Sequence, residues 1–247
     1  AVGELLDRLS LTERVMEANT ADNTRWIFHR GALVPAPLSP LALLKTPLLS
    51  LGAKLRIFLE PLIPKRSAGP EESLADFVGR RLGRGIVENL LSPMVAGIFA
   101  ARPEELSVGA AFPQLVAMEQ QHGSLFKALR RREKRGAPRL QTLKGGAGAL
   151  TQHMGERLGE RLRLGQPLLG MQASATGWTL QFAHETVEAD AVVLACPAYA
   201  QANLLRSAAP ELSEALRQIA YSAVAVVVSI YPKTAWPDPP SGFGALA

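Results

Sequence analysis

Hydrophobic and polar positions first define a helical stretch in the middle of the chain. From residue 74 to 90, apolar residues recur at spacings of three to five and mark one buried face: Leu74, Phe77, Leu82, Ile86 and Leu90. Ser73 and Asp76 form the S-x-x-D pattern of a helix N-terminus. The pattern predicts a helix that ends at Pro93, and a further helix over residues 107–122.

The segments before this helix are less regular. Residues 3–18 read as a short helix, and residues 24–29 alternate as a strand does, with a turn at Arg30 and Gly31. Residues 29–40 (HRGALVPAPLSP) contain three prolines, so we expect irregular structure there. Residues 38–62 are dense in leucine but interrupted by prolines, so only pieces such as 48–59 can be helical.

After Gly136 the pattern changes to short strands and helices. A glycine turn (Gly145, Gly146 and Gly148) opens a predicted helix over 149–158, and another helix is expected over 212–219. The expected strands are residues 162–164, 168–174, 179–183, 191–195 and 223–231. Residues 191–195 are fully apolar, which is typical of a strand buried on both faces. The predicted fold class is therefore mixed α/β (α+β), with an all-helical insertion.

Composition narrows the function only slightly. The 247 residues are 47% hydrophobic and 20% charged, as in ordinary folded proteins, and the net charge is +5. A dense basic run lies between Lys127 and Arg139 without interleaved aromatic residues, which disfavours nucleic acid. A solvated linker is the simpler interpretation of this run, and attraction to an anionic membrane surface is the alternative.

Other common kinds of chemistry find little support. Cys196 is the single cysteine and is expected to be an inert core thiol, while the four histidines are scattered without ligand spacing, so no metal site is predicted. No hydrolase motif occurs, and no catalytic side chain is assigned. The sequence has no apolar run of membrane-spanning length and opens without the features of a signal peptide.

An ordered series of short motifs is more informative than any one of them. The series comprises Thr24-Arg25-Trp26-Ile27 with Gly31, Pro37–Pro40, Leu55-Arg56, Glu60-Pro61, Glu72-Ser73, Arg80–Gly83, Val95–Gly97, Leu106-Ser107, Phe112-Pro113, Gly145-Gly146, Ala195–Pro197 and Gly242–Gly244. In order and spacing it resembles the oxygen-dependent protoporphyrinogen oxidases, within the flavin amine oxidase superfamily.

The resemblance has two departures. The family commonly has an aromatic residue, then Ala or Gly, Gly and Asp before Pro, where this chain has Phe99-Ala100-Ala101-Arg102-Pro103. The chain also lacks the family's N-terminal glycine-rich FAD-binding turn and its C-terminal flavin-binding segment, so we expect an internal segment that is inactive alone.

The resemblance implies parts of an FAD-binding domain and a substrate domain. The expected division is 1–37 as the end of the N-terminal FAD and substrate region, 38–135 as a helical membrane-associated insertion, 136–198 as part of the FAD-binding domain and 199–247 as part of the substrate domain. The implied activity is FAD-dependent oxidation of protoporphyrinogen IX by O2 in haem biosynthesis. The expected partners are a tetrapyrrole substrate, a membrane surface and a second copy in a homodimer, with no nucleic acid. The expected location is cytoplasmic, peripheral on the inner membrane.

The resemblance also assigns binding roles to individual residues. Arg25 corresponds to an arginine that pairs with a substrate propionate, Gly97 to a glycine over the macrocycle, and Leu246 to an apolar residue against the ring. Leu168 corresponds to a strand position that meets the adenine part of FAD. Without the resemblance, these residues would read as a surface arginine, a helix C-terminal glycine, a frayed chain end and a core strand residue.

Several functions stay open at this point. Coproporphyrinogen III is a rival substrate within the same family, and another flavin amine oxidase activity is a further candidate. A non-enzymatic membrane-surface interaction module is the alternative of a different class.

Overall fold

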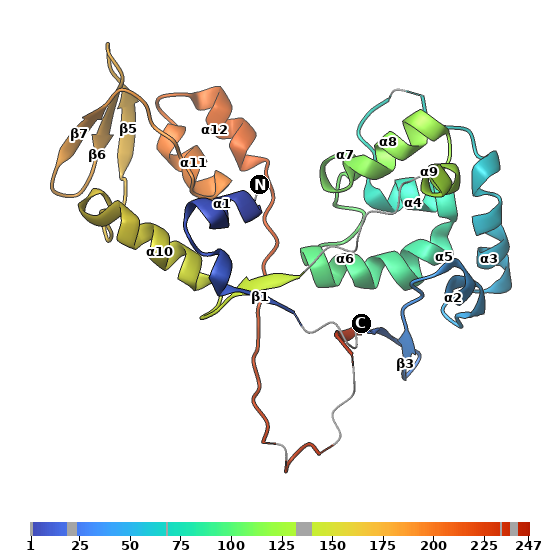
Figure 1. Ribbon diagram of the computed structural model, residues 1–247. Coiled ribbons are helices and arrows are strands. Elements are labelled where there is room, and N and C mark those ends of the chain that lie inside the picture. The colour runs from blue at the N-terminus through green and yellow to red at the C-terminus, as the bar shows by residue number, and fades with distance from the viewer. Residues whose placement is uncertain (1, 19–23, 68, 132–139, 233, 238–241) are drawn as a thin grey trace. The chain divides into compact units, whose positions relative to one another are not determined.

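A computed structural model describes residues 2–18, 24–67, 69–131, 140–232, 234–237 and 242–247. Its contacts divide the chain into two units (Figure 1). Residues 1–18 and 139–221 form the first, called here the α/β unit, and residues 19–138 and 222–247 form the second, called the helical unit. The four-segment division expected from the sequence stays a prediction. Its boundary at 135/136, and residues 132–139 of the basic run, lie outside the described residues.

The α/β unit begins with a small packed cluster. Helix α1 (Val2–Arg8) and a 3-10 turn (Thr12–Arg14) lead into β1 (Val15–Glu17), which pairs antiparallel with β4 (Gln141–Leu143). Helix α10 (Gly148–Leu158) follows the predicted glycine turn, and the 3-10 turn Gly159–Arg161 ends it. Leu6, Leu11, Leu143 and Ala149 form the buried centre of this cluster.

A three-stranded antiparallel sheet and a helix pair complete the α/β unit (Figure 1). The strands are β5 (Gly170–Ala173), β6 (Trp178–Gln181) and β7 (Thr186–Ala189), in that spatial order. Helices α11 (Ala198–Leu205) and α12 (Pro210–Arg217) pack on each other, and the buried Ser213 hydroxyl donates a 2.7 Å hydrogen bond to the carbonyl of Ala202.

The helical unit is built from short helices. In chain order they are α2 (Pro40–Lys45), α3 (Leu51–Phe58), the 3-10 turn Glu60–Leu62, α4 (Leu74–Leu82), α5 (Arg84–Ile86), the π-turn Val87–Leu91, α6 (Ser92–Phe99), α7 (Val108–Ala111), α8 (Pro113–His122) and α9 (Leu125–Arg131). The predicted cap is present, because the Ser73 hydroxyl accepts a 3.0 Å bond from the Asp76 amide. Phe77, Val95 and Val108 lie in the buried core.

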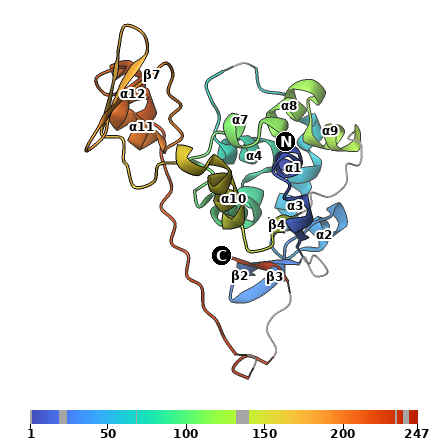
Figure 2. The ribbon, with the colours of Figure 1, turned by 60° about the vertical axis from the view of Figure 1, so that its left-hand side comes forward.

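A small sheet belongs to the same unit (Figure 2). Strand β2 (Arg25–His29) pairs antiparallel with β3 (Ala32–Pro35) and parallel with β8 (Gly244–Leu246). The predicted turn at Arg30 and Gly31 is confirmed: both residues have positive φ, 51° and 84°, as a two-residue hairpin loop requires. The expectation of irregular structure over 29–40 was wrong for residues 32–35, because Pro35 ends an edge strand, where its missing N–H is tolerated, and it was right for residues 36–39.

Helix boundaries differ from the sequence prediction at three places, one of which is Phe112, where the helix expected over 107–122 divides into α7 and α8. The helix expected to end at Pro93 instead breaks at Gly83, which has a φ of 98°, and the chain resumes through the π-turn into α6. Pro93 lies at the junction of the π-turn and α6, inside a helical stretch that continues from Val87, so its missing N–H falls where the regular α-helical bonding is already interrupted. The run Val95–Gly97 is therefore helical, and residues 3–18 form a helix, a turn and a strand rather than one helix.

Three expected strands are absent from the described structure. Residues 162–164 follow a 3-10 turn without pairing, and the segments 191–195 and 223–231 have no strand partner. Val193 is 91% exposed, so residues 191–195 are not the buried strand that their apolar pattern predicts, and Ile230, in the other unpaired segment, is 92% exposed. Apolar sequence specifies a strand only where a neighbouring strand satisfies its backbone groups. Cys196, expected in the core, is only half-buried.

Charged side chains occupy the centre of the helical unit. Arg81 is 0% exposed and forms ion pairs with Glu60, also 0% exposed, and with Glu119, at 3.3 Å. Glu60 also accepts hydrogen bonds from the Ser124 hydroxyl and the Leu125 amide. These bonds join α4, α8, α9 and the 3-10 turn at Glu60, so the charges fix the helices to one another.

Candidate functional site

The expected substrate residues meet where β2, β8 and α6 pack together. Arg25 is the register partner of Gly244, and Ile27 is the partner of Leu246. Side chains two residues apart on a strand share a face of the sheet. Arg25 and the buried Ile27 therefore lie on the face that carries Leu246, with Arg25 one pleat away from it.

Gly97 permits close contact between α6 and β8. A Cβ atom built on Gly97 would overlap Cδ2 of Leu246, so a larger residue there would require the Leu246 side chain to shift. The reading of Gly97 as a helix C-terminal glycine was wrong, because Ala100 holds that position with a φ of 48°. The reading of Leu246 as a frayed end was also wrong, because β8 pairs with β2.

The Arg25 side chain is exposed at the edge of this face. Its guanidinium lies over the ring of Phe243, 5.7 Å from the ring centre, where a cation is attracted by the aromatic face. No carboxylate of the described residues pairs with it. The arrangement presents two-pronged hydrogen-bond donors beside an apolar contact, which suits a carboxylate attached to an apolar ring.

Leu168 is not part of this cluster. It belongs to the α/β unit, where it is half-buried and lies just before β5 rather than within a strand. The next residue, Leu169, donates a 2.8 Å bond to the carbonyl of Gln181, which ties the segment to β6. The structure thus brings together Arg25, Gly97 and Leu246, and Leu168 stays a separate prediction.

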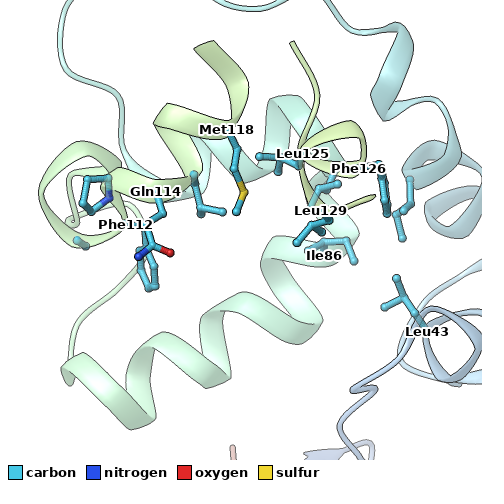
Figure 3. Close-up of a pocket in the computed structure, with 13 residues that line it drawn as sticks. Leu43, Ile86, Phe112, Gln114, Met118, Leu125, Phe126 and Leu129 are labelled. Carbon is cyan, nitrogen blue, oxygen red and sulfur yellow. The ribbon is translucent and has the colours of Figure 1, made fainter. Parts of the chain in front are cut away.

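A cavity of about 590 Å³ opens among the helices of the helical unit (Figure 3). Leu43, Ile86, Met118 and Leu129 are among its aliphatic walls, and Gln114 is the one amide side chain that lines it. Phe112, at one end, packs edge-to-face on Phe99 with ring centres 5.5 Å apart. Its size is that of a small-ligand site, and its lining selects apolar ligands.

The departure from the family pattern at Arg102 has a local explanation. Arg102 pairs with Glu105 three residues on, and the hydrogen bonds between them raise the pKa of Arg102 and lower the pKa of Glu105. Both side chains are mostly exposed, so the pair closes the turn after α6 and adds no charge to the face that carries Arg25.

The fold and the sequence together define the class of protein. The chain matches the model of the flavin containing amine oxidoreductases over residues 1–246 and belongs to that family. The mixed α/β fold expected from the sequence is confirmed, since a related solved structure shares it: a candidate protoporphyrinogen oxidase from Exiguobacterium sp. 255-15. That structure is 30% identical with a TM-score of 0.69, and the match covers 86% of this chain and 49% of that one.

One curated relative carries the same name, and another is named for a related oxidation. The chloroplastic protoporphyrinogen oxidase of Oryza sativa subsp. japonica is 32% identical over 233 residues, which is 85% of this chain and 44% of that protein. The coproporphyrinogen III oxidase of Bacillus subtilis is 28% identical over 215 residues, covering 83% and 45%. The family expectation is confirmed, and the chain spans about half the length of the curated relatives it matches.

The family implies a flavin cofactor. Within the described residues, Leu168 could supply an apolar contact beside β5, but the sequence has no G-x-G-x-x-G turn to receive a pyrophosphate. The glycines before α10 precede a helix, yet Lys144 stands before them rather than after, unlike a phosphate-binding loop. The residues present do not form a complete flavin site.

Sequence reasoning missed two contributors to the site. Phe243 was noted only as part of a glycine motif, and its contact with Arg25 follows from the parallel pairing of β2 and β8. Ile27 alternates with Arg25 in the strand pattern, which would have placed both on one face. The helix cavity gave no local signal, because its walls come from segments far apart in the chain.

Proposed function

We propose that this chain is part of an FAD-dependent oxidase that converts protoporphyrinogen IX to protoporphyrin IX with O2 as acceptor, in haem biosynthesis. The carrying observation is the contact between Gly97 and Leu246 one pleat away from the exposed Arg25 guanidinium. An apolar macrocycle bearing carboxylates is the ligand chemistry that this face fits. The relatives named above act on molecules of this kind by name.

The overall reaction removes six electrons and six protons from the porphyrinogen, and three O2 molecules accept them as hydrogen peroxide. FAD, when bound, supplies the hydride chemistry. The residues described here bind and orient: Arg25 holds a propionate, while Leu246 and the α6 backbone at Gly97 set the position of the ring. No catalytic side chain is assigned among them.

Coproporphyrinogen III is the second candidate substrate, favoured by the relative from Bacillus subtilis. It carries four carboxylates where protoporphyrinogen IX carries two, so it would need additional cations. Comparing initial rates on the two porphyrinogens distinguishes the candidates. Faster oxidation of coproporphyrinogen III would move the assignment to that reaction.

Membrane association is the second part of the proposal. Residues 38–62 carry apolar side chains exposed by 40–79%: Leu38, Leu41, Leu44, Leu51, Leu55, Phe58, Leu59 and Leu62, called here the leucine surface. Basic residues at 45, 54, 56, 65 and 66 border it. Such a surface fits the interface of an anionic bilayer, and we propose peripheral attachment to the inner membrane on its cytoplasmic side. None of the helices in the described part has the length and apolarity to cross a bilayer.

Arg25→Ala in the flavin-loaded enzyme tests the substrate assignment. Loss of one charge-assisted contact costs roughly 1.5–3 kcal/mol, or about 10- to 150-fold in affinity. We expect most of this loss in KM, measured by the fluorescence of the porphyrin formed, with flavin content unchanged. Arg25→Lys should recover only part of it, because an ammonium lacks the planar fork.

Arg30→Ala is the matched control, since Arg30 is an exposed arginine of the same hairpin at its turn. It should leave KM unchanged. Equal kinetics for Arg25→Ala and the unmodified enzyme would remove Arg25 from the site and leave it a surface arginine.

A further inference from the structure

The helix cavity continues into a second, smaller cavity. Leu43, Ile57 and Phe126 line both the 590 Å³ cavity and a neighbouring one of about 250 Å³. Leu38, Leu44 and Phe58 of the leucine surface also line the smaller cavity. The two cavities therefore adjoin between the leucine surface and the space among α5, α8 and α9, and together they are called here the apolar passage. Figure 3 shows side chains that line its inner part.

A cation stands at the outer part of this passage. Lys54 lines the smaller cavity together with Ser39, and its ammonium has no ion-pair or hydrogen-bond partner among the described residues. The charged residues of the neighbouring helices are all basic. Helices α2, α3 and α9 carry only basic charged residues: Lys45, Lys54, Arg56, Lys127, Arg130 and Arg131. Arg56 is engaged with the carbonyls of Arg80 and Arg81, which leaves Lys54 as the cation inside the passage.

We propose that the helical unit binds one anionic amphiphile, with its alkyl chain in the inner cavity and its head group at Lys54. The size and apolar walls of the inner cavity suit a flexible hydrocarbon chain. A partly buried, unpaired ammonium favours a carboxylate or phosphate head. This deepens the membrane attachment proposed above, because a bilayer is one source of such molecules and free fatty acids are the other.

The site is separate from the face that carries Arg25. Neither Arg25, Gly97 nor Leu246 lines either cavity. The amphiphile is therefore expected to bind without occupying the position assigned to the tetrapyrrole. It would act as a lipid anchor of the helical unit.

Calorimetric titration of the 247-residue chain with dodecanoate, below micelle formation and without vesicles, tests the inference. We expect saturable binding of one molecule. Each methylene buried should tighten binding about fourfold, so decanoate should bind about 16-fold more weakly. Lys54→Gln should weaken dodecanoate about two- to fivefold and leave dodecan-1-ol unaffected.

Variants that fill the inner cavity test whether the alkyl chain of dodecanoate lies there. Leu129→Trp and Gln114→Trp add bulk at exposed positions that line the inner cavity, and each should reduce dodecanoate affinity more than tenfold with an unchanged circular dichroism spectrum. Leu55→Trp is the control, because Leu55 is 66% exposed and lies outside both cavity linings. An equal loss in Leu55→Trp would mean surface adsorption and would overturn the site.

Two further results separate this inference from the proposed function. Flotation with anionic vesicles but no saturable dodecanoate binding would leave membrane attachment standing and refute the cavity site. Saturable dodecanoate binding without flotation would support the cavity site and refute membrane attachment. Displacement of dodecanoate by protoporphyrin IX in the unmodified chain would show that the passage takes the rigid ring and would also refute the inference.

Discussion

The helical unit buries charges at its centre and exposes leucines at one side. Arg81 and Glu60 are 0% exposed, whereas Leu51 and Leu62, within twelve residues of Glu60, are each 79% exposed. The difference shows that partners, rather than residue type, decide burial in this unit. The charges are buried because each has an opposite charge and hydrogen bonds available, and these leucines stay outside because no described segment packs on them.

The two regions consequently have different roles. The charge cluster joins helices that carry and flank the amphiphile passage, so it is structural. The leucine surface contributes little to folding, since its side chains are exposed in the isolated chain, and it is available for a partner of low polarity. Each prediction below changes one region and asks whether the other responds.

The largest expected effect comes from breaking the buried pair. Glu60→Ala removes one of the two carboxylates that pair with Arg81 and leaves only Glu119, at 3.3 Å, in a site where the Arg81 Nε atom already has no partner. Breaking a buried pair costs roughly 3–5 kcal/mol. Urea unfolding of the 247-residue chain, followed by circular dichroism, measures this loss. Vesicle binding per folded molecule should not change.

Glu105→Ala is the control for that variant. It removes a carboxylate from an arginine–glutamate pair of the same kind, with both side chains mostly exposed. Solvent screens such a pair, so its removal should have little measurable effect. A loss in Glu105→Ala as large as in Glu60→Ala would show that burial is not what makes the central cluster matter.

Acid should affect the central cluster next. Burial raises the pKa of Glu60, but hydrogen bonds from Ser124, the Leu125 amide and Arg81 outweigh it, so the pKa lies below its ordinary value. Burial likewise raises the pKa of Glu119, and bonds from Arg80 and the Arg66 amide outweigh it. Both groups then hold more protons in the unfolded chain than in the folded one at mildly acid pH.

Their contribution is therefore complete above the ordinary carboxyl pKa and is lost as the pH falls through the lower folded values. Unfolding in urea at a series of pH values should show falling stability below about pH 4.5. The fall should be smaller than that of Glu60→Ala, because protonation keeps the side chain and part of its hydrogen bonding. Glu60→Gln should flatten the profile, and an unaltered slope in that variant would assign the acid sensitivity to other groups.

Comparison with the sequence predictions shows which features are local. The Ser73 cap, the hairpin turn at Arg30 and the strand at 25–29 were predicted correctly, because a few neighbouring residues decide them. The exposed segment 223–231 reads as a strand by pattern, yet pairing depends on a partner elsewhere in the chain. The meeting of Arg25, Gly97 and Leu246 could be expected only through the family resemblance, since more than two hundred residues separate Arg25 from Leu246.

Changes in the leucine surface should have the smallest effect on folding stability. They also distinguish this surface most sharply from the buried charge cluster. Leu51→Ser, Leu55→Ser and Leu62→Ser each change a largely exposed side chain, so each should alter the free energy of unfolding by less than about 0.5 kcal/mol. Leu49→Ala is the internal contrast: Leu49 is 4% exposed, two residues from Leu51, and its truncation should cost roughly 2–5 kcal/mol. Flotation with anionic vesicles should reverse this order, with the triple serine variant losing lipid binding and Leu49→Ala retaining it in the folded fraction. A triple variant that unfolds readily would mean that these leucines belong to the core in solution. A stable triple variant that still floats would remove the leucine surface from the membrane contact and leave the basic residues beside it as the attachment.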